Sequence, residues 1–167
     1  MDAIAAFNAM PADRLDADLL ACLAVPEWAA RIAARRPYRS KADLYAVADA
    51  AARALSWADV LTALSAHPRI GERAQGDSRA AAWSRSEQTV AGRSDDDATK
   101  AALAEANRAY EQRFGHVFLI FATGRTPDEI LAAARARLAN DEATERNVVA
   151  DELRRIALLR LERLLDG

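Results

Sequence analysis

The run Val117-Phe118-Leu119-Ile120-Phe121-Ala122 decides between an all-helical and a mixed fold. A short apolar run of this length can be a strand, an extended segment or a buried turn. The chain offers no obvious partner strand for it, and a lone strand does not make a sheet. We therefore expect an all-α protein with one short extended apolar segment over residues 117–122.

On both sides of this run the chain carries helix start signals. Ser40 and Ser56 each place a capping hydroxyl three residues before a carboxylate, and Thr126 is followed by Pro127 at the first helical position. A loop is expected over 71–77 and a break at Gly92. The predicted helices cover about residues 11–23, 26–36, 41–54, 57–66, 78–91, 94–114, 126–140 and 142–165. We expect a single-domain bundle of about eight helices over residues 1–167.

Composition narrows the class of protein. The chain has 167 residues, of which 51% are hydrophobic and 29% charged, as in one soluble globular domain. A net charge of -2 argues against a nucleic-acid surface. The lone Cys22 lies in an apolar run and predicts a buried, reduced thiol, which suits the cytoplasm. No apolar run approaches the roughly 20 residues of a membrane span. Two histidines with one cysteine make a histidine- or thiolate-rich metal site improbable.

His67 is one of only two histidines and stands directly before Pro68. Because proline restricts the residue before it, His67 is expected at the end of the preceding helix. The carbonyls at that end carry partial negative charge, which favours the imidazolium and makes His67 a candidate proton donor near neutral pH. The structural alternative is that His67 is a C-terminal cap and nothing more.

Glu87 is the second candidate for chemistry. A carboxylate partly buried beside the Trp83 indole is expected to have a raised pKa unless a cation pairs with it, and in that condition Glu acts as an acid or base. The alternative is a capping box formed by Ser84 and Glu87. Helical spacing places Glu87 on one face of its helix with Ala80, Trp83 and Val90. This face is flanked by Ser84, Gln88 and Ala91.

Arg160 falls in the middle of the apolar face of the last predicted helix. A guanidinium there must meet a carboxylate or an anionic ligand, because an unpaired buried charge costs several kcal/mol. A salt bridge to Glu87 or Asp49 and the attraction of an anionic substrate are the alternatives. The apolar face itself is defined by Val149, Leu153, Ile156 and Leu164.

Two further polar residues lie near apolar ones. Asn107 shares a helical stripe with Leu103 and Tyr110, which predicts a buried, hydrogen-bonded amide. His116 follows Gly115 in a loop, and no direct chemical role is expected for it.

Several motifs together resemble the family of 2-oxo-4-hydroxy-4-carboxy-5-ureidoimidazoline (OHCU) decarboxylases, over nearly the whole chain. The resemblance implies an all-helical, dimeric, cofactor-free and metal-free enzyme of urate breakdown that forms (S)-allantoin. The lack of a C-terminal Ser-Lys-Leu signal fits a cytoplasmic member. The motifs are His-Pro-Arg-Ile-Gly-Glu at 67–72, Trp83-Ser84 with Glu87-Gln88, Asn107 with Tyr110, the run 114–125, and Leu159-Arg160-Leu161.

By the same resemblance, His67 and Glu87 are catalytic. The substrate-binding residues that it implies are Pro68, Ser84, Arg85, Ser86, Gln88, Leu119, Ile120, Phe121, Ala122, Thr123 and Arg160. Position 116 is expected to be aromatic in many members and is His here.

The chemistry of the substrate supports so small a site. Its carboxylate sits next to a C=N bond that can take up the electrons released with CO2, so no cofactor is needed as an electron sink. Backbone amides of residues 119–123 could hydrogen-bond the planar ureide groups. Two alternatives stay open: a non-enzymatic helical interaction module, and a hydrolase of a related ureide that uses the same His and Glu.

Overall fold

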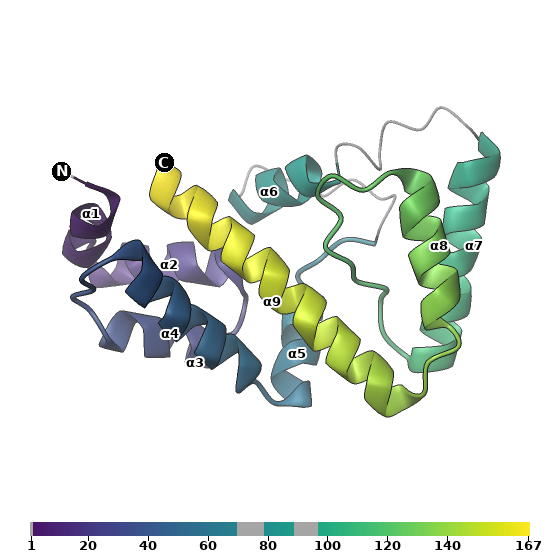
Figure 1. Ribbon diagram of the computed structural model, residues 1–167, viewed down its shortest axis with the longest axis horizontal. Helices are drawn as coiled ribbons and strands as arrows, with labels where there is room; N and C mark the ends of the chain where they lie inside the picture. Colours follow the sequence, from purple (N-terminus) through teal and green to yellow (C-terminus); the bar gives the residue numbers. More distant parts are fainter. Residues whose placement is uncertain (1, 70–78, 89–96) are drawn as a thin grey trace. The chain divides into compact units, whose positions relative to one another are not determined.

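The computed structural model describes residues 2–69, 79–88 and 97–167. Within these ranges the chain forms nine helices and no strand, which confirms the predicted all-α fold (Figure 1). The helices are α1 (Ala3–Ala9), α2 (Ala12–Cys22), α3 (Pro26–Ala34), α4 (Lys41–Arg53), α5 (Trp57–Leu64), α6 (Arg79–Glu87), α7 (Asp97–Phe114), α8 (Pro127–Arg137) and α9 (Glu142–Asp166).

The hydroxyl caps predicted from the sequence are present at three helix starts. Each cap satisfies one of the backbone N–H groups that a helix leaves unbonded at its N-terminus. The bonded pairs are Asp43 N to Ser40 Oγ at 3.1 Å, Asp59 N to Ser56 Oγ at 3.1 Å, and Glu129 N to Thr126 Oγ1 at 3.2 Å.

The helix α1 was not predicted, and it is the difference between the eight expected helices and the nine observed in the described residues. Seven residues make too short a helix to be stable alone, so its stability has to come from caps and packing. Asp2 caps its start by accepting from the Ala5 amide at 2.8 Å. Phe7 is buried, and Arg36 Nη1 donates to carbonyls at the end of the helix, including that of Met10 at 2.7 Å.

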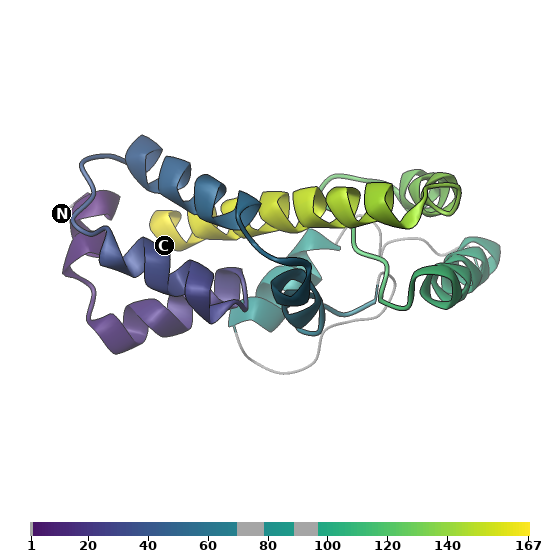
Figure 2. The ribbon, with the colours of Figure 1, turned by 90° about the horizontal axis from the view of Figure 1, so that it is seen from below.

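The chain divides into two compact units, and the first comprises residues 1–63 and 154–167. Figure 2 shows α3 lying beside both α2 and α4. Trp28 of α3 is fully buried, and its indole Nε1 donates to the Ala48 carbonyl of α4 at 3.0 Å. Cys22 is buried as predicted and forms no disulfide.

The second unit comprises residues 64–153. In Figure 1, α7 and α8 lie side by side and run in the same direction, so the connection over residues 115–126 has to return along their length. This connection contains the apolar run 117–122, which is neither helix nor strand. The core of this unit combines the run with the two helices and contains Leu103, Ala106, Tyr110, Phe118, Ile120, Ala122, Ile130, Leu131 and Ala134.

Three predicted helix ends differ from the structure by two or three residues. Helix α3 ends at Ala34 rather than 36, α5 at Leu64 rather than 66, and α8 at Arg137 rather than 140. The predicted loop over 71–77, the helix end at Ala91, the break at Gly92 and the Ser94 cap lie outside the described residues. The expectation that residues 1–167 form a single domain stays a prediction. Within the described ranges, no helix combines the length and the apolar character of a membrane span.

Candidate active site

His67 lies just beyond the end of α5, which confirms its predicted place at a helix end. Its backbone N–H donates to the Leu64 carbonyl at 3.0 Å and so closes the last turn of the helix. The His67 and Pro68 side chains are both half-buried. The backbone of His67 is therefore fixed at the end of α5, while part of the residue stays accessible.

Arg69 ties this corner to α7. Its Nε donates to Glu111 Oε1 at 2.6 Å, and its Nη2 donates to Glu111 Oε2 at 3.3 Å. The paired geometry fixes direction as well as distance. Because 51% of the Arg69 side chain is exposed, the bridge contributes more to the placement of His67 and Pro68 than to stability.

Ser84 and Glu87 both lie on the buried face of α6. Ser84 is 4% exposed and Glu87 is 7% exposed. The helix begins at Arg79, so Ser84 is a mid-helix residue, and the alternative of a Ser84–Glu87 capping box is wrong. A cap would leave Glu87 in solvent at the first turn, whereas here the carboxylate points the way the core does.

The buried face of α6 is centred on Ser84 rather than on the predicted stripe through Ala80 and Trp83. Its fully buried members are Ala81, Ser84 and Glu87, while Trp83 is half-buried and has the Arg79 guanidinium 5.8 Å from its ring centroid. The predicted stripe members Val90 and Ala91 lie outside the described residues.

The remaining α6 candidates differ in position. Arg85 and Gln88 are half-buried, and the backbone N–H of Gln88 donates to the Ser84 carbonyl at 3.3 Å. Ser86 is exposed and lies on roughly the opposite side of the helix from Ser84. One small ligand cannot contact the side chains of both serines from a single face.

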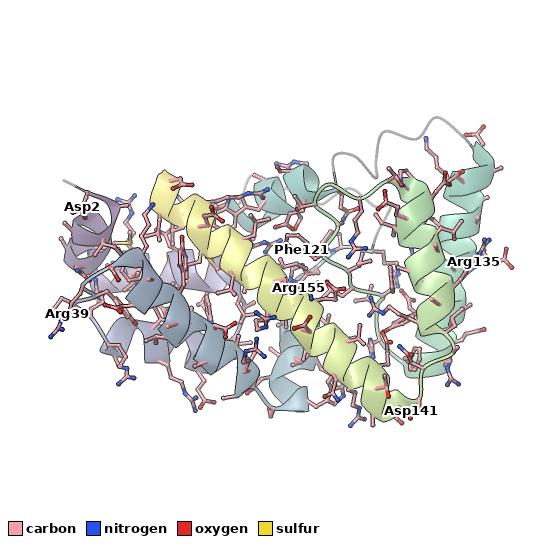
Figure 3. The ribbon with its side chains drawn as sticks, in the orientation of Figure 1. Asp2, Arg39, Phe121, Arg135, Asp141 and Arg155 are labelled. Carbon is pink, nitrogen blue, oxygen red and sulfur yellow. The ribbon has the colours of Figure 1, made fainter. Side chains whose placement is uncertain are left out.

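The apolar connection between α7 and α8 is held by side chains at two of its residues. Arg137 Nη1 donates to the Leu119 carbonyl at 2.7 Å. At Phe121, labelled in Figure 3, the backbone N–H donates to Glu152 Oε2 at 3.2 Å and the carbonyl accepts from Arg125 Nε at 2.9 Å. The Phe121 N–H therefore already has an acceptor, and the expectation that backbone amides of residues 119–123 bind the ureide stays a prediction for the others.

Other polar groups of the same segment have no such partner. The structure shows, within its described residues, no hydrogen bond to the backbone of Ile120 and none to the buried Thr123 hydroxyl. Buried polar groups in proteins are almost always paired with protein, water or ligand. The Ile120 backbone and the Thr123 hydroxyl are therefore polar groups of this segment that the described part of the chain leaves without a hydrogen bond.

A buried ionic network, which the sequence did not predict, is joined to this segment by the bond from Arg137 to the Leu119 carbonyl. Arg137 and Glu145 form a buried salt bridge, and Tyr110 donates its hydroxyl to Glu145 Oε1 at 2.5 Å. Asn140 Nδ2 donates to the other oxygen of Glu145 at 3.0 Å. Burial raises the pKa of Tyr110, and its hydrogen bond to Glu145 raises this pKa further, so the phenol stays a donor.

Rings pack around this network. The His116 ring meets the Tyr110 ring edge-on, with 5.5 Å between centroids, and stacks with Phe114 at 6.2 Å. His116 thus packs as a ring against Tyr110 and Phe114, and the expectation that it has no direct chemical role stays a prediction. Asn107 is buried, as predicted, on the same helix as Tyr110.

Arg160 is buried, as predicted, with 3% of its surface exposed, and its Nη1 donates to the Ala21 carbonyl at 3.1 Å. The alternative of an Asp49–Arg160 bridge is wrong, because Asp49 is paired with Arg53 and Arg154. The hydrogen bond with Arg53, and to a smaller extent the one with Arg154, lowers the pKa of Asp49. The sequence missed Arg154 because its position on α9 indicated a solvent-facing side chain.

The candidate residues divide between the two units. His67, Pro68, the α6 residues 84–88 and the segment 119–123 belong to the unit of residues 64–153, whereas Arg160 belongs to the other. The motif residues Ile70, Gly71 and Glu72 lie outside the described residues. Among the residues that are described, no group of three or more His, Cys, Asp or Glu side chains is arranged to hold a metal ion.

Comparison with known families and proteins gives a consistent result. A family model described as OHCU decarboxylase matches residues 8–162. Two proteins named 2-oxo-4-hydroxy-4-carboxy-5-ureidoimidazoline decarboxylase are similar to the chain. The one from Amia calva is 33% identical over 84% of this chain and 81% of its own length. The one from Haloferax volcanii is 32% identical over 81% and 79%.

A longer relative is the uric acid degradation bifunctional protein TTL of Arabidopsis thaliana, which is 33% identical over 86% of this chain. The match spans 45% of that protein's length. Among solved structures, the crystal structure of OHCU decarboxylase in the presence of (S)-allantoin has a TM-score of 0.76 and 30% identity, over 90% of this chain and 99% of the other. A structure of (S)-allantoin synthase, at 19% identity and a TM-score of 0.73 over 96% of this chain and 53% of its own, shares the fold.

Proposed function

The chain belongs to the OHCU decarboxylase family, and we propose that His67 and Glu87 carry out its reaction, the loss of CO2 from OHCU to form (S)-allantoin in urate degradation. Family membership makes the chain a carboxy-lyase and decides against a non-enzymatic module. The observation that supports the residue assignment is Glu87: a carboxylate 7% exposed in the middle of a helix, with no capping role, in the same unit as His67.

The reaction asks little of the protein beyond placement and one proton. The carbon that bears the carboxylate lies next to a ring C=N bond, so when the bond to CO2 breaks, its electron pair moves toward the ring nitrogen. An enol-like intermediate results. The ring nitrogen then takes up a proton, the enol hydroxyl loses its proton to become the ring carbonyl, and one proton delivered to the neighbouring ring carbon gives allantoin. Delivery to a single face of that carbon gives a single enantiomer. A positioned acid–base pair can do this.

In this scheme His67 supplies or relays the proton, and Glu87 orients His67 and holds the substrate. His67 suits the proton transfer because imidazole titrates near neutral pH. Glu87 suits the second role because its carboxylate is held on a rigid, buried helix face beside Ser84. Pro68, Ser84, Arg85 and Gln88 are proposed to complete the binding surface on this side, whereas Ser86 lies on roughly the opposite side of the helix.

The segment 119–123 is proposed to bind the planar ureide. In extended backbone, the N–H and C=O of successive residues point to opposite edges. Arg137 and Glu152 bond to Leu119 and Phe121, and the Ala122 carbonyl accepts from the Arg125 N–H at 3.0 Å. The Ile120 N–H and C=O, on the other edge, are therefore the groups proposed to meet the ligand. A ureide offers the same N–H and C=O groups as a peptide. The buried Thr123 hydroxyl and the neighbouring Ala122 amide extend this edge.

Arg160 is proposed as a substrate-binding residue on the grounds of its burial and charge. Arg160→Met keeps most of the stem volume and removes the guanidinium. We expect the KM for OHCU to rise by about tenfold, the loss of one charge-assisted contact, in steady-state assays. Arg14→Met, at an exposed arginine of the same unit, is the control. An unchanged KM for Arg160→Met would remove Arg160 from the site.

We propose that catalysis needs no cofactor, because the electron sink is part of the substrate. Chelator-treated protein added to OHCU freshly made by urate oxidation is expected to accelerate its decay and to yield optically active allantoin, whereas the uncatalysed decay yields a racemate. The measurement is absorbance and circular dichroism in parallel. Loss of turnover on chelation, restored by added metal, would overturn the cofactor-free scheme.

Assembly and location are proposed from the family resemblance. The resemblance implies a homodimer, and the buried Cys22, which forms no disulfide, is compatible with a reducing compartment such as the cytoplasm.

A further inference from the structure

We propose that Glu152 is a positioning residue: by accepting the Phe121 N–H, its carboxylate aims the opposite edge of the segment 119–123 at the substrate. This inference rests on the proposed function of that segment. It concerns a residue of α9 that none of the sequence motifs contains.

The contact itself is specific. Glu152 is 9% exposed, and its Oε2 accepts from the Phe121 backbone N–H at 3.2 Å. Among the described residues this is the one hydrogen bond of the Glu152 side chain. A nearly buried carboxylate with no cation on it costs free energy that a bond to one neutral amide does not offset. Such a residue is unfavourable for folding alone, which points to a functional reason for it.

Glu152 acts together with two other side chains. Arg137 holds the Leu119 carbonyl at 2.7 Å, and Arg125 holds the Phe121 carbonyl at 2.9 Å. Along one edge of the segment, Arg137 therefore supplies a donor, Glu152 an acceptor and Arg125 a second donor. A neighbouring strand would supply its N–H and C=O groups in the same way. Side chains replace the partner strand that the sequence lacks.

The consequence lies on the other edge. In an extended backbone, the N–H and C=O of the residue between 119 and 121 point to the edge opposite the groups that Glu152 and Arg137 bond. No described residue bonds the N–H or C=O of Ile120. On the same edge the Ala122 carbonyl accepts from the Arg125 N–H at 3.0 Å, so the Ile120 N–H and C=O and the Ala122 N–H are the groups that fit the coplanar N–H and C=O groups of a cyclic ureide.

Two conservative variants test this role. Glu152→Asp keeps the charge but draws the carboxylate back by one methylene, whereas Glu152→Gln keeps an oxygen acceptor at full reach. For Glu152→Asp we expect the KM for OHCU and the dissociation constant for (S)-allantoin to rise about tenfold, with kcat changed less than about threefold. Glu152→Gln is expected to stay close to wild type in both constants.

The matched control is Glu142→Asp, at an exposed glutamate at the start of the same helix, which should change neither constant. Amide hydrogen exchange at Phe121, followed by NMR, should accelerate in Glu152→Asp and not in Glu142→Asp. Unchanged KM in Glu152→Asp, or unchanged exchange at Phe121, would overturn the proposal. A wild-type protein inactive on OHCU would instead overturn the proposed function, so the two failures are distinguishable.

Discussion

His67→Asn and Glu87→Gln are each expected to lower kcat for OHCU by about 10² to 10⁴, the usual contribution of a positioned acid or base. Both substitutions keep the size of the side chain and remove its ability to exchange a proton. The Glu87 carboxylate is buried on α6, and His67 is held by the end of α5, so neither change displaces a helix. The measurement is steady-state turnover of freshly made OHCU.

Stability separates chemistry from folding in this experiment. If His67 only caps a helix, its loss should cost no more than about 1 kcal/mol and leave turnover within a few-fold of wild type. Glu105→Gln, at an exposed position of α7, serves as a control for removing a carboxylate. Wild-type-like kcat in His67→Asn and Glu87→Gln would remove the catalytic assignment and leave the family assignment intact.

Arg137→Met is expected to lower the free energy of unfolding by about 3 to 5 kcal/mol, because it leaves a buried carboxylate without its cation. Glu145 is fully buried and accepts from Arg137, Tyr110 and Asn140. The Leu119 carbonyl loses its donor in the same variant. A decrease of roughly 6 to 20 °C in Tm is expected for a protein of this size.

Two further variants sharpen that result. Arg135→Met, at an exposed arginine of the same helix labelled in Figure 3, should change stability by less than about 0.5 kcal/mol. Adding Glu145→Leu to Arg137→Met should recover part of the loss, since no charge is then left buried. An Arg137→Met protein that melts like wild type would show that the network does not hold the segment 119–123 in place.

Much of the fold could be predicted because its signals are local. A hydroxyl three residues before a carboxylate, or a proline at the first turn, acts within a few residues, and the caps at Ser40, Ser56 and Thr126 are present. The helix α1 escaped prediction because its support is not local. Its last carbonyls are bonded by Arg36, 26 residues beyond Met10.

The candidate site could be predicted in part for the same reason. Helical periodicity identified Glu87 and Arg160 as charges facing inward, and both are buried. The same test applied to the first half of α9 finds Glu145 and Glu152 on or beside the stripe of Val149 and Leu153. Applied to α8, it finds Arg137 on the stripe of Ile130 and Ala134.

The bonding partners of these buried charges could not be predicted from the sequence, because helical periodicity indicates which way a side chain points and not which group it contacts. Glu152 is 31 residues away in the sequence from Phe121, whose N–H it accepts, and Arg137 is 18 residues away from Leu119, whose carbonyl it bonds. For Asp49 the sequence suggested a wrong partner. Its charge made it a candidate for a salt bridge with Arg160, whereas in the structure it forms salt bridges with Arg53 and Arg154. Only the three-dimensional path of the chain determines such pairings.

The most direct test of the proposed mechanism is the double-mutant cycle of His67→Asn and Glu87→Gln on OHCU turnover. If the two residues act as a unit on one reacting ring, the double variant should have a kcat within about fivefold of the slower single variant. If the two losses multiply instead, so that the double variant is slower by the product of the single effects, the residues act independently and the mechanism proposed for them is contradicted.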